Sequence, residues 1–143
     1  MEKEKPESTY QQIEEIIGWY HTNSSNSHVS DLLDNRDKLA ILSFRLSKIV
    51  GDVKGDYNSA YFMRVINVAR EKQAQIEQKL AYNKAEVLAL LKNEKHYKDA
   101  IEKESISFKN DMLLKGVNKV LEAMNQRISF ANTENRNSNY TRT

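Results

Sequence analysis

Large apolar side chains recur at helical spacing from Leu32 to Leu80, and no proline interrupts that stretch. Such a period places one apolar stripe along a helix, so the pattern predicts a single helix from about residue 30 to about residue 80. Gly51 and Gly55 fall near its middle, and a glycine inside a helix costs about 1 kcal/mol relative to alanine. The alternative to one softened helix is a pair of helices that meet at a hinge there.

Start signals and apolar periodicity predict three further helices. Pro6, followed by a Ser-Thr pair and two glutamines, resembles a capping box and predicts a short helix through Tyr20. Asn83 with Glu86 three residues later opens a second short helix with the sequence KAEVLALL, which a polar stretch follows. A last long helix is expected over about residues 97–130.

Glycine occurs four times and proline once, which is too few for a turn-rich sheet protein. We therefore expect an all-α fold: an elongated helical hairpin of two long amphipathic helices, with a short connecting helix and a short N-terminal helix. With 39% hydrophobic and 29% charged residues, such helices expose most of their circumference, so we expect the chain to oligomerise. The side chains expected at an oligomer or partner interface are large and apolar: Trp19, Leu39, Leu42, Leu46, Leu113, Val117, Leu121 and Met124.

Composition divides the chain into three parts. Residues 1–28 are an acidic leader that holds the short helix and a polar linker, residues 29–130 are the hairpin body, and residues 131–143 are a polar tail expected to be disordered. Residues 1–37 carry three basic and eight acidic side chains, whereas residues 38–143 carry nineteen basic and twelve acidic ones. A basic body suits an anionic partner, although a solvated helix surface also shows such asymmetry by chance.

The sequence carries no signature of catalysis or of a metal site. Cysteine is absent, and His21, His28 and His96 lack the spacing of a helical metal pair. Carboxylate pairs such as Glu102 and Glu104 are routine on solvated helices, so we expect no enzyme and no cofactor. The first residues lack the apolar core of a signal peptide, and no run approaches the roughly 18 apolar residues of a membrane span. We expect a soluble, cytoplasmic protein without membrane contact.

The second half of the long helix interleaves cations with aromatic rings. Lys54, Arg64, Arg70 and Lys72 alternate there with Tyr57, Tyr61 and Phe62. Cations track phosphates and aromatic faces stack on unpaired bases, so the pattern favours binding of single-stranded nucleic acid. The alternative is structural: Tyr61 belongs to the helix core, and Arg70 and Lys72 pair with nearby glutamates.

Three runs of the sequence resemble a known family. They are RDKLAILSFRLSKIVGDVKGDYNSAYFMRVINVAREKQ, YNKAEVLALLKNEKHYKDAIEKES and FKNDMLLKGVNKVLEAMNQRIS, and they span about residues 30 to 130. They contain a long amphipathic helix, a short Ala- and Leu-rich helix that opens with Lys-Ala-Glu, and a final helix with spaced Lys and Leu. In these features the chain resembles the phage-encoded UvsY-like recombination mediators.

The resemblance implies a ring-forming homo-oligomer that binds single-stranded DNA. Such a protein contacts a recombinase and a single-strand DNA-binding protein, and it helps to load the recombinase onto DNA. Basic residues of the long helix contact DNA in that family, which points here to Arg64, Arg70 and Lys72. The leader of residues 1–28 and the polar tail fall outside the resemblance.

Two functions are thus expected. The first is a phage recombination or replication accessory protein that binds single-stranded DNA in the cytoplasm of a host cell. The second is a helical structural or adaptor protein that self-assembles and binds another protein without binding nucleic acid. A phage assembly component and an inhibitor of a host system are examples of the second class.

Overall fold

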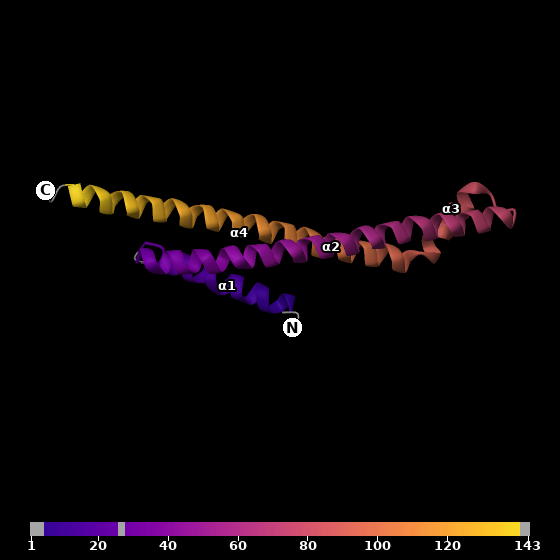
Figure 1. Cartoon of the computed structure of the whole chain (residues 1–143). Coiled ribbons are helices and arrows are strands. Elements are labelled where there is room, and N and C mark those ends of the chain that lie inside the picture. Colours follow the sequence, from indigo (N-terminus) through magenta and orange to yellow (C-terminus); the bar gives the residue numbers. More distant parts are fainter. Residues whose placement is uncertain (1–4, 26–27, 141–143) are drawn as a thin grey trace. The chain divides into compact units, whose positions relative to one another are not determined.

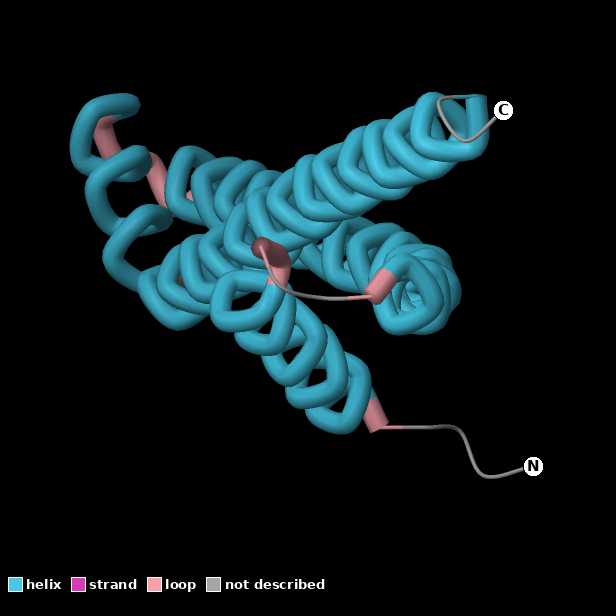
Figure 2. Tube along the Cα trace, turned by 90° about the vertical axis from the view of Figure 1, so that its left-hand side faces the viewer, coloured by secondary structure: helices cyan, strands magenta, loops and turns pink. Residues whose placement is uncertain are grey.

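The computed structural model describes residues 5–25 and 28–140, and every regular element within them is an α-helix (Figures 1 and 2). The all-α prediction is therefore confirmed. The helices are α1 (Pro6–Asn23), α2 (Val29–Glu77), α3 (Tyr82–Lys92) and α4 (Glu94–Tyr140). They form two compact units, and both α2 and α4 contribute to each of them.

Helix α2 runs without a break through Gly51 and Gly55, as the apolar period predicts. A Cβ atom added at either glycine would meet no atom within 4 Å, so no close contact requires a glycine at these positions. The hinge alternative is therefore not what the structure shows. Glycine lowers the helix propensity here without breaking the helix.

The end of α2 is set by a residue in the left-handed conformation. Lys79 has a φ of 66°, which is uncommon for a residue with a side chain. The Leu80 N–H donates to the Gln75 carbonyl at 3.3 Å, and the Lys79 N–H donates to the Ile76 carbonyl at 2.9 Å. This pair of bonds is the Schellman arrangement, and it satisfies carbonyl groups that the end of the helix leaves without partners.

The starts of the two short helices differ from the capping prediction. Helix α1 begins at Pro6, which suits the first helical position because its N–H would have no partner there. Ser8 consequently lies inside the helix, where its hydroxyl accepts a hydrogen bond from Gln12 at 3.0 Å. Helix α3 begins at Tyr82 with no side-chain cap, so Asn83 is likewise an internal residue.

A single residue, Asn93, separates α3 from α4, where the sequence suggested a polar stretch. Its side-chain amide donates to the Ala89 carbonyl at 2.8 Å and so closes the end of α3. Its own carbonyl accepts from the Tyr97 N–H at 3.1 Å and so opens the first turn of α4. Because one residue serves both helices, α4 begins at Glu94 and not near Tyr97.

Helix α4 continues to Tyr140, past the predicted end near Phe130. Residues 131–140 are therefore helical, in contrast to the disordered tail that we expected. No glycine or proline occurs there to stop the helix. Thr133 also donates its hydroxyl to the Ser129 carbonyl at 2.9 Å, so its polar group is satisfied within the helix. Residues 141–143 lie outside the described residues.

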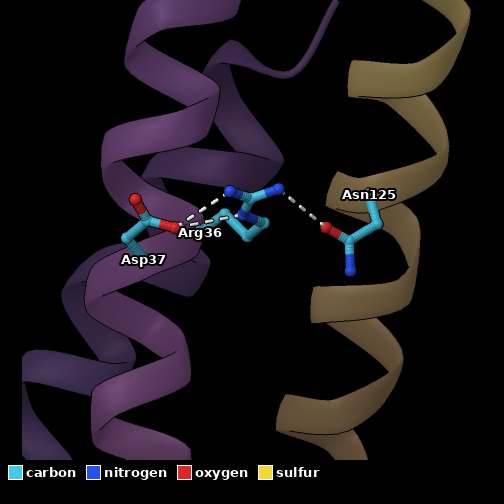
Figure 3. Close-up of polar contacts among 3 residues, drawn as sticks. All are labelled: Arg36, Asp37 and Asn125. Carbon is cyan, nitrogen blue, oxygen red and sulfur yellow. Dashed lines mark hydrogen bonds and ion pairs between the residues drawn. The ribbon is translucent and has the colours of Figure 1, made fainter.

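The first unit combines α1, the part of α2 up to Ile49 and the part of α4 from Asp111 onward. Helices α2 and α4 are antiparallel in this unit. Arg36 donates to Asn125 at 3.3 Å (Figure 3), and further along α2 Ser43 donates to Asn118 at 3.2 Å. Most of the buried core is made of large side chains: Ile13, Ile16, Leu32, Leu39, Leu42, Leu46, Val117, Met124 and Ile128.

The second unit combines α2 from Val50, the whole of α3, and α4 up to Asn110. Its buried apolar residues are small, since they are the alanines Ala85, Ala89 and Ala100. Small side chains let helix axes approach closely, but they bury little apolar area. This unit therefore covers much less of its own apolar surface than the first unit does.

Candidate interaction surface

The four predicted cations all belong to the part of α2 in the second unit, but they do not form one patch. At about 100° per residue, Lys54 and Lys72 lie on the same side of the helix, about 27 Å apart along its axis. Arg64 lies about 80° from Lys72 around the helix, whereas Arg70 lies about 160° away from it. The structure therefore groups Lys54, Arg64 and Lys72 on one strip and leaves Arg70 outside it.

Arg64 is held between two aromatic rings. Its guanidinium carbon lies 5.3 Å from the centre of the Tyr61 ring and 4.9 Å from the centre of the Tyr97 ring of α4. An arginine over an aromatic face is attracted by the negative face of the ring. Arg64 and Tyr97 also line a hollow of about 420 Å³ whose apolar wall includes Val68, Leu90 and Leu91. This cation is thus fixed by its neighbours and still half-exposed.

Lys72 makes a comparable pair with Tyr82 of α3. Its ammonium donates a hydrogen bond to the Tyr82 hydroxyl and lies 3.9 Å from the centre of the ring. The hydrogen bond stabilises the charged form, so Tyr82 raises the pKa of Lys72 above its ordinary value. Lys72 therefore keeps its charge throughout the neutral range.

Glu71 forms its ion pair with α3 and not with a cation of α2. Its carboxylate accepts hydrogen bonds from Lys92 and Gln75, both at 2.8 Å. The bond from Lys92, followed by the bond from Gln75, lowers the pKa of Glu71. The structural alternative for the cations expected Glu71 to pair with Arg70 or Lys72. Its principal partner is instead Lys92 of α3.

The aromatic residues near this strip are partly exposed. Tyr57 and Tyr61 lie with ring centres 6.4 Å apart, and Tyr61 meets Phe62 edge-on at 6.2 Å. Tyr82 and Tyr97, which the sequence pattern does not indicate as site residues, are 60% and 49% exposed. The pairing of Tyr82 with Lys72 depends on how the turn between α2 and α3 places them, and the pairing of Tyr97 with Arg64 depends on how α2 and α4 pack. In the sequence, the one indication that these two tyrosines belong to a binding site is that each lies beside lysines.

We call Lys54, Tyr57, Tyr61, Arg64, Lys72, Tyr82 and Tyr97 the basic–aromatic strip. Lys54 is exposed and Tyr57 is half-buried. Cation and ring together offer a phosphate partner and a stacking face within a few ångströms. Chemically, the strip is suited to binding an anionic partner.

Most of the residues predicted at an oligomer interface are instead the core of a single chain. Leu39, Leu42, Leu46, Val117 and Met124 are all buried within the first unit. Helix α1 contributes Ile13 and Ile16 to the same core. Trp19, Leu113 and Leu121 are partly exposed.

Exposed apolar side chains gather instead in the second unit. On α3, Val87, Leu88, Leu90 and Leu91 are exposed, and Leu91 keeps 65% of its surface. The part of α2 in this unit also has exposed apolar side chains on one face: Phe62, Val65, Ile66 and Ile76. Large contiguous apolar patches on soluble proteins often mark interaction sites.

Residues 5–25 and 28–140 contain no group of three or more potential metal ligands and no helix long and apolar enough to cross a membrane. No family model, curated protein or solved structure matches the chain. The resemblance to UvsY-like mediators therefore stays a prediction that rests on the sequence runs alone.

Proposed function

We propose that this chain is a binding protein, not an enzyme, that self-associates and holds single-stranded DNA along the basic–aromatic strip of its second unit. In the form that the resemblance to UvsY-like mediators suggests, it is a phage accessory protein in the host cytoplasm. It would help a recombinase to replace a single-strand DNA-binding protein on DNA.

The observation that carries the proposal is the position of Arg64 between Tyr61 and Tyr97. A cation that is fixed beside two partly exposed rings meets a phosphate and an unpaired base at once, with little side-chain entropy left to lose. Lys72 with Tyr82 repeats the same combination along the helix. The raised pKa of Lys72 keeps that second cation charged.

Self-association is supported by the exposed apolar face of the second unit. Leu90 and Leu91 on α3 and Phe62 on α2 are each more than half exposed. Burying such side chains against another copy removes apolar surface from water, at about 25 cal/mol per Å². Several copies would also present several strips to one DNA strand, which raises the overall affinity without a new contact.

Fluorescence anisotropy with a labelled oligo-dT tests the proposal. Arg64→Gln should weaken binding about tenfold, because it removes a charged contact and the ring pairing. Arg127→Gln, an exposed arginine of the first unit, is the matched control and should leave the affinity unchanged. Circular dichroism of each variant shows whether the helices are retained.

The salt dependence separates a phosphate contact from a structural role. If Arg64 contacts a phosphate, the slope of log K against log salt should fall by about 0.7 in Arg64→Gln. An unchanged slope with weaker binding would mean that Arg64 only positions Tyr61 and Tyr97. Equal binding by Arg64→Gln and the native protein would refute the proposed surface.

The mediator role needs its own measurement. A recombinase on single-stranded DNA that is coated with its single-strand DNA-binding protein hydrolyses ATP slowly until the coat is displaced. Addition of this chain should shorten the lag before ATP hydrolysis reaches its full rate, and the Arg64→Gln variant should shorten this lag less. An oligo-dT complex without any change in the lag would leave a DNA-binding protein that is not a mediator.

The second candidate is the adaptor protein, and the exposed leucines of α3 favour it. Deleting residues 1–28 does not distinguish the two functions, because Ile13 and Ile16 belong to the core of the first unit. Leu91→Glu tests assembly without disturbing that core, since Leu91 is 65% exposed. Both functions predict that this variant loses its assembly, so retention of oligo-dT decides between them: an adaptor does not retain oligo-dT, either as the native chain or as the variant.

A further inference from the structure

A second hollow lies in the first unit, between α1 and α2. Its volume is about 520 Å³, which is within the range of sites that hold small ligands or anchoring side chains. Residues from both helices line it, among them Glu15, Ile16 and Trp19 of α1 and Lys38, Ile41 and Arg45 of α2. We call this hollow the α1–α2 groove.

The middle of the α1–α2 groove is apolar and only partly covered. Ile16 and Leu42 are buried and form its base, while Trp19 is half-buried. Ile41 is 58% exposed although it borders the same hollow. A large aliphatic side chain beside an indole gains free energy from any apolar group that displaces water there.

The α2 wall of the groove is positively charged. Lys38 and Arg45 line it, and Glu15 is the one carboxylate among the described lining residues. Lys38 is exposed and has no ion pair or hydrogen bond with another residue that the structure describes.

We infer that the α1–α2 groove docks a short acidic, amphipathic segment of another protein. A large apolar side chain of that segment would sit against Trp19 and Ile41, and its carboxylates would face Lys38. Oppositely charged groups at the edge of a groove orient the partner and speed its association, while the buried apolar anchor supplies most of the affinity. The groove belongs to the first unit and the basic–aromatic strip to the second, so docking does not require nucleic-acid binding.

Trp19 is the single tryptophan of the chain, so its fluorescence reports on this groove directly. The probe is a short synthetic peptide, acetyl-Asp-Asp-Leu-Phe-Asp-Asp-Leu-amide, titrated into the full-length chain. Binding should shift the Trp19 emission to the blue, because the peptide excludes water from the indole. The same peptide with Asn at every Asp should bind about tenfold more weakly, since it lacks the charge.

Two substitutions in the groove and one control locate the site. Lys38→Glu should weaken peptide binding about tenfold, because it replaces an attraction by a repulsion. Ile41→Ser should weaken it about as much by removing apolar contact. Lys119→Glu reverses an exposed charge of α4 in the same unit and outside the groove lining, and it should bind the peptide as the native chain does.

Several results would overturn the inference. If the Trp19 spectrum does not respond to about 1 mM peptide, the peptide binds with less than about 4 kcal/mol, and the groove is not its docking site. Equal binding of the Asn peptide would show that charge does not select the partner. A blue shift on raising the protein concentration without peptide would show that a second copy fills the groove.

Competition with oligo-dT keeps this inference distinct from the proposed function. Displacement of the peptide by oligo-dT would place the groove in the nucleic-acid surface and overturn a separate protein site. Lys38→Glu should retain oligo-dT as the native chain does, whereas Arg64→Gln should retain the peptide. If Lys38→Glu also loses oligo-dT, the groove is part of the nucleic-acid surface. If Arg64→Gln also loses the peptide, the peptide does not bind in the groove alone.

Discussion

Replacing Leu46 with alanine tests whether the apolar face of α2 is the core of one chain or a surface between copies. Leu46 is 0% exposed within its own chain. The substitution removes three carbon groups at about 0.8 kcal/mol each and leaves a cavity, which together cost about 3 kcal/mol. For a chain of this size the melting temperature should fall by about 10 °C.

Urea unfolding followed by Trp19 fluorescence measures this loss in the first unit, where both residues lie. The matched control is Leu91→Ala on α3, because the same side chain is deleted from a position that is 65% exposed. That control should change the stability of a dilute monomer by less than about 0.5 kcal/mol. Leu46→Ala should therefore lose more stability than Leu91→Ala, because Leu46 is buried within its own chain and Leu91 is not.

Two other results would place Leu46 between copies of the chain and not in the core of one. If Leu46→Ala lowered the mass of an assembly while the unfolding of the dilute chain stayed unchanged, Leu46 would lie between copies. An unfolding midpoint that depended on protein concentration in the native chain and lost that dependence in Leu46→Ala would lead to the same conclusion. Light scattering at two concentrations distinguishes these cases.

Three further predictions concern helix ends and one carboxylate. Lys79→Gly should raise the free energy of unfolding by about 1 kcal/mol in urea, because the φ of 66° costs a residue with a side chain and costs glycine nothing; a lower midpoint would contradict the assigned left-handed turn. Asn93→Ala should lower it by about 1 kcal/mol through loss of the buried bond to the Ala89 carbonyl, and an unchanged melting curve would argue against that cap. The pKa of Glu71 is lowered in the folded chain by Lys92, so its stabilising effect is complete above its ordinary pKa of 4.5 and is lost as the pH falls through the lower folded value. Urea midpoints across that acid range should therefore fall less steeply in Glu71→Gln, and identical slopes would refute the pairing.

The sequence predicted the helices well because their signal is local. The apolar period from Leu32 to Leu80 and the absence of proline were sufficient to predict α2 as one long helix. Helix ends were less predictable, since Ser8 and Asn83 look like caps but lie inside helices. Pro6 and Asn93 set the ends instead, through backbone geometry that residue type alone does not reveal.

The candidate site was predictable only in part, because it depends on which helices meet. The sequence identified Arg64 and Lys72 as cations among rings, and the structure places both against tyrosines. It could not identify Tyr97 or Tyr82 as their partners, since each pairing depends on how one helix packs against another and not on residue type. Arg70 was grouped with them by proximity in sequence, although a helix turns it to another side.

The two units bury different kinds of side chain, and this difference affects which of them gains stability from a partner. The first unit places leucine, isoleucine and methionine inside, so a third helix, α1, completes its core within one chain. The second unit places alanines inside and leaves Leu90 and Leu91 in water. An exposed leucine adds no hydrophobic stabilisation to a lone chain, whereas its burial by a partner contributes up to about 2 kcal/mol of free energy. Association is therefore expected to stabilise the second unit and to change the first unit little, so protection of amide hydrogens should rise with protein concentration in α3 and not in α1.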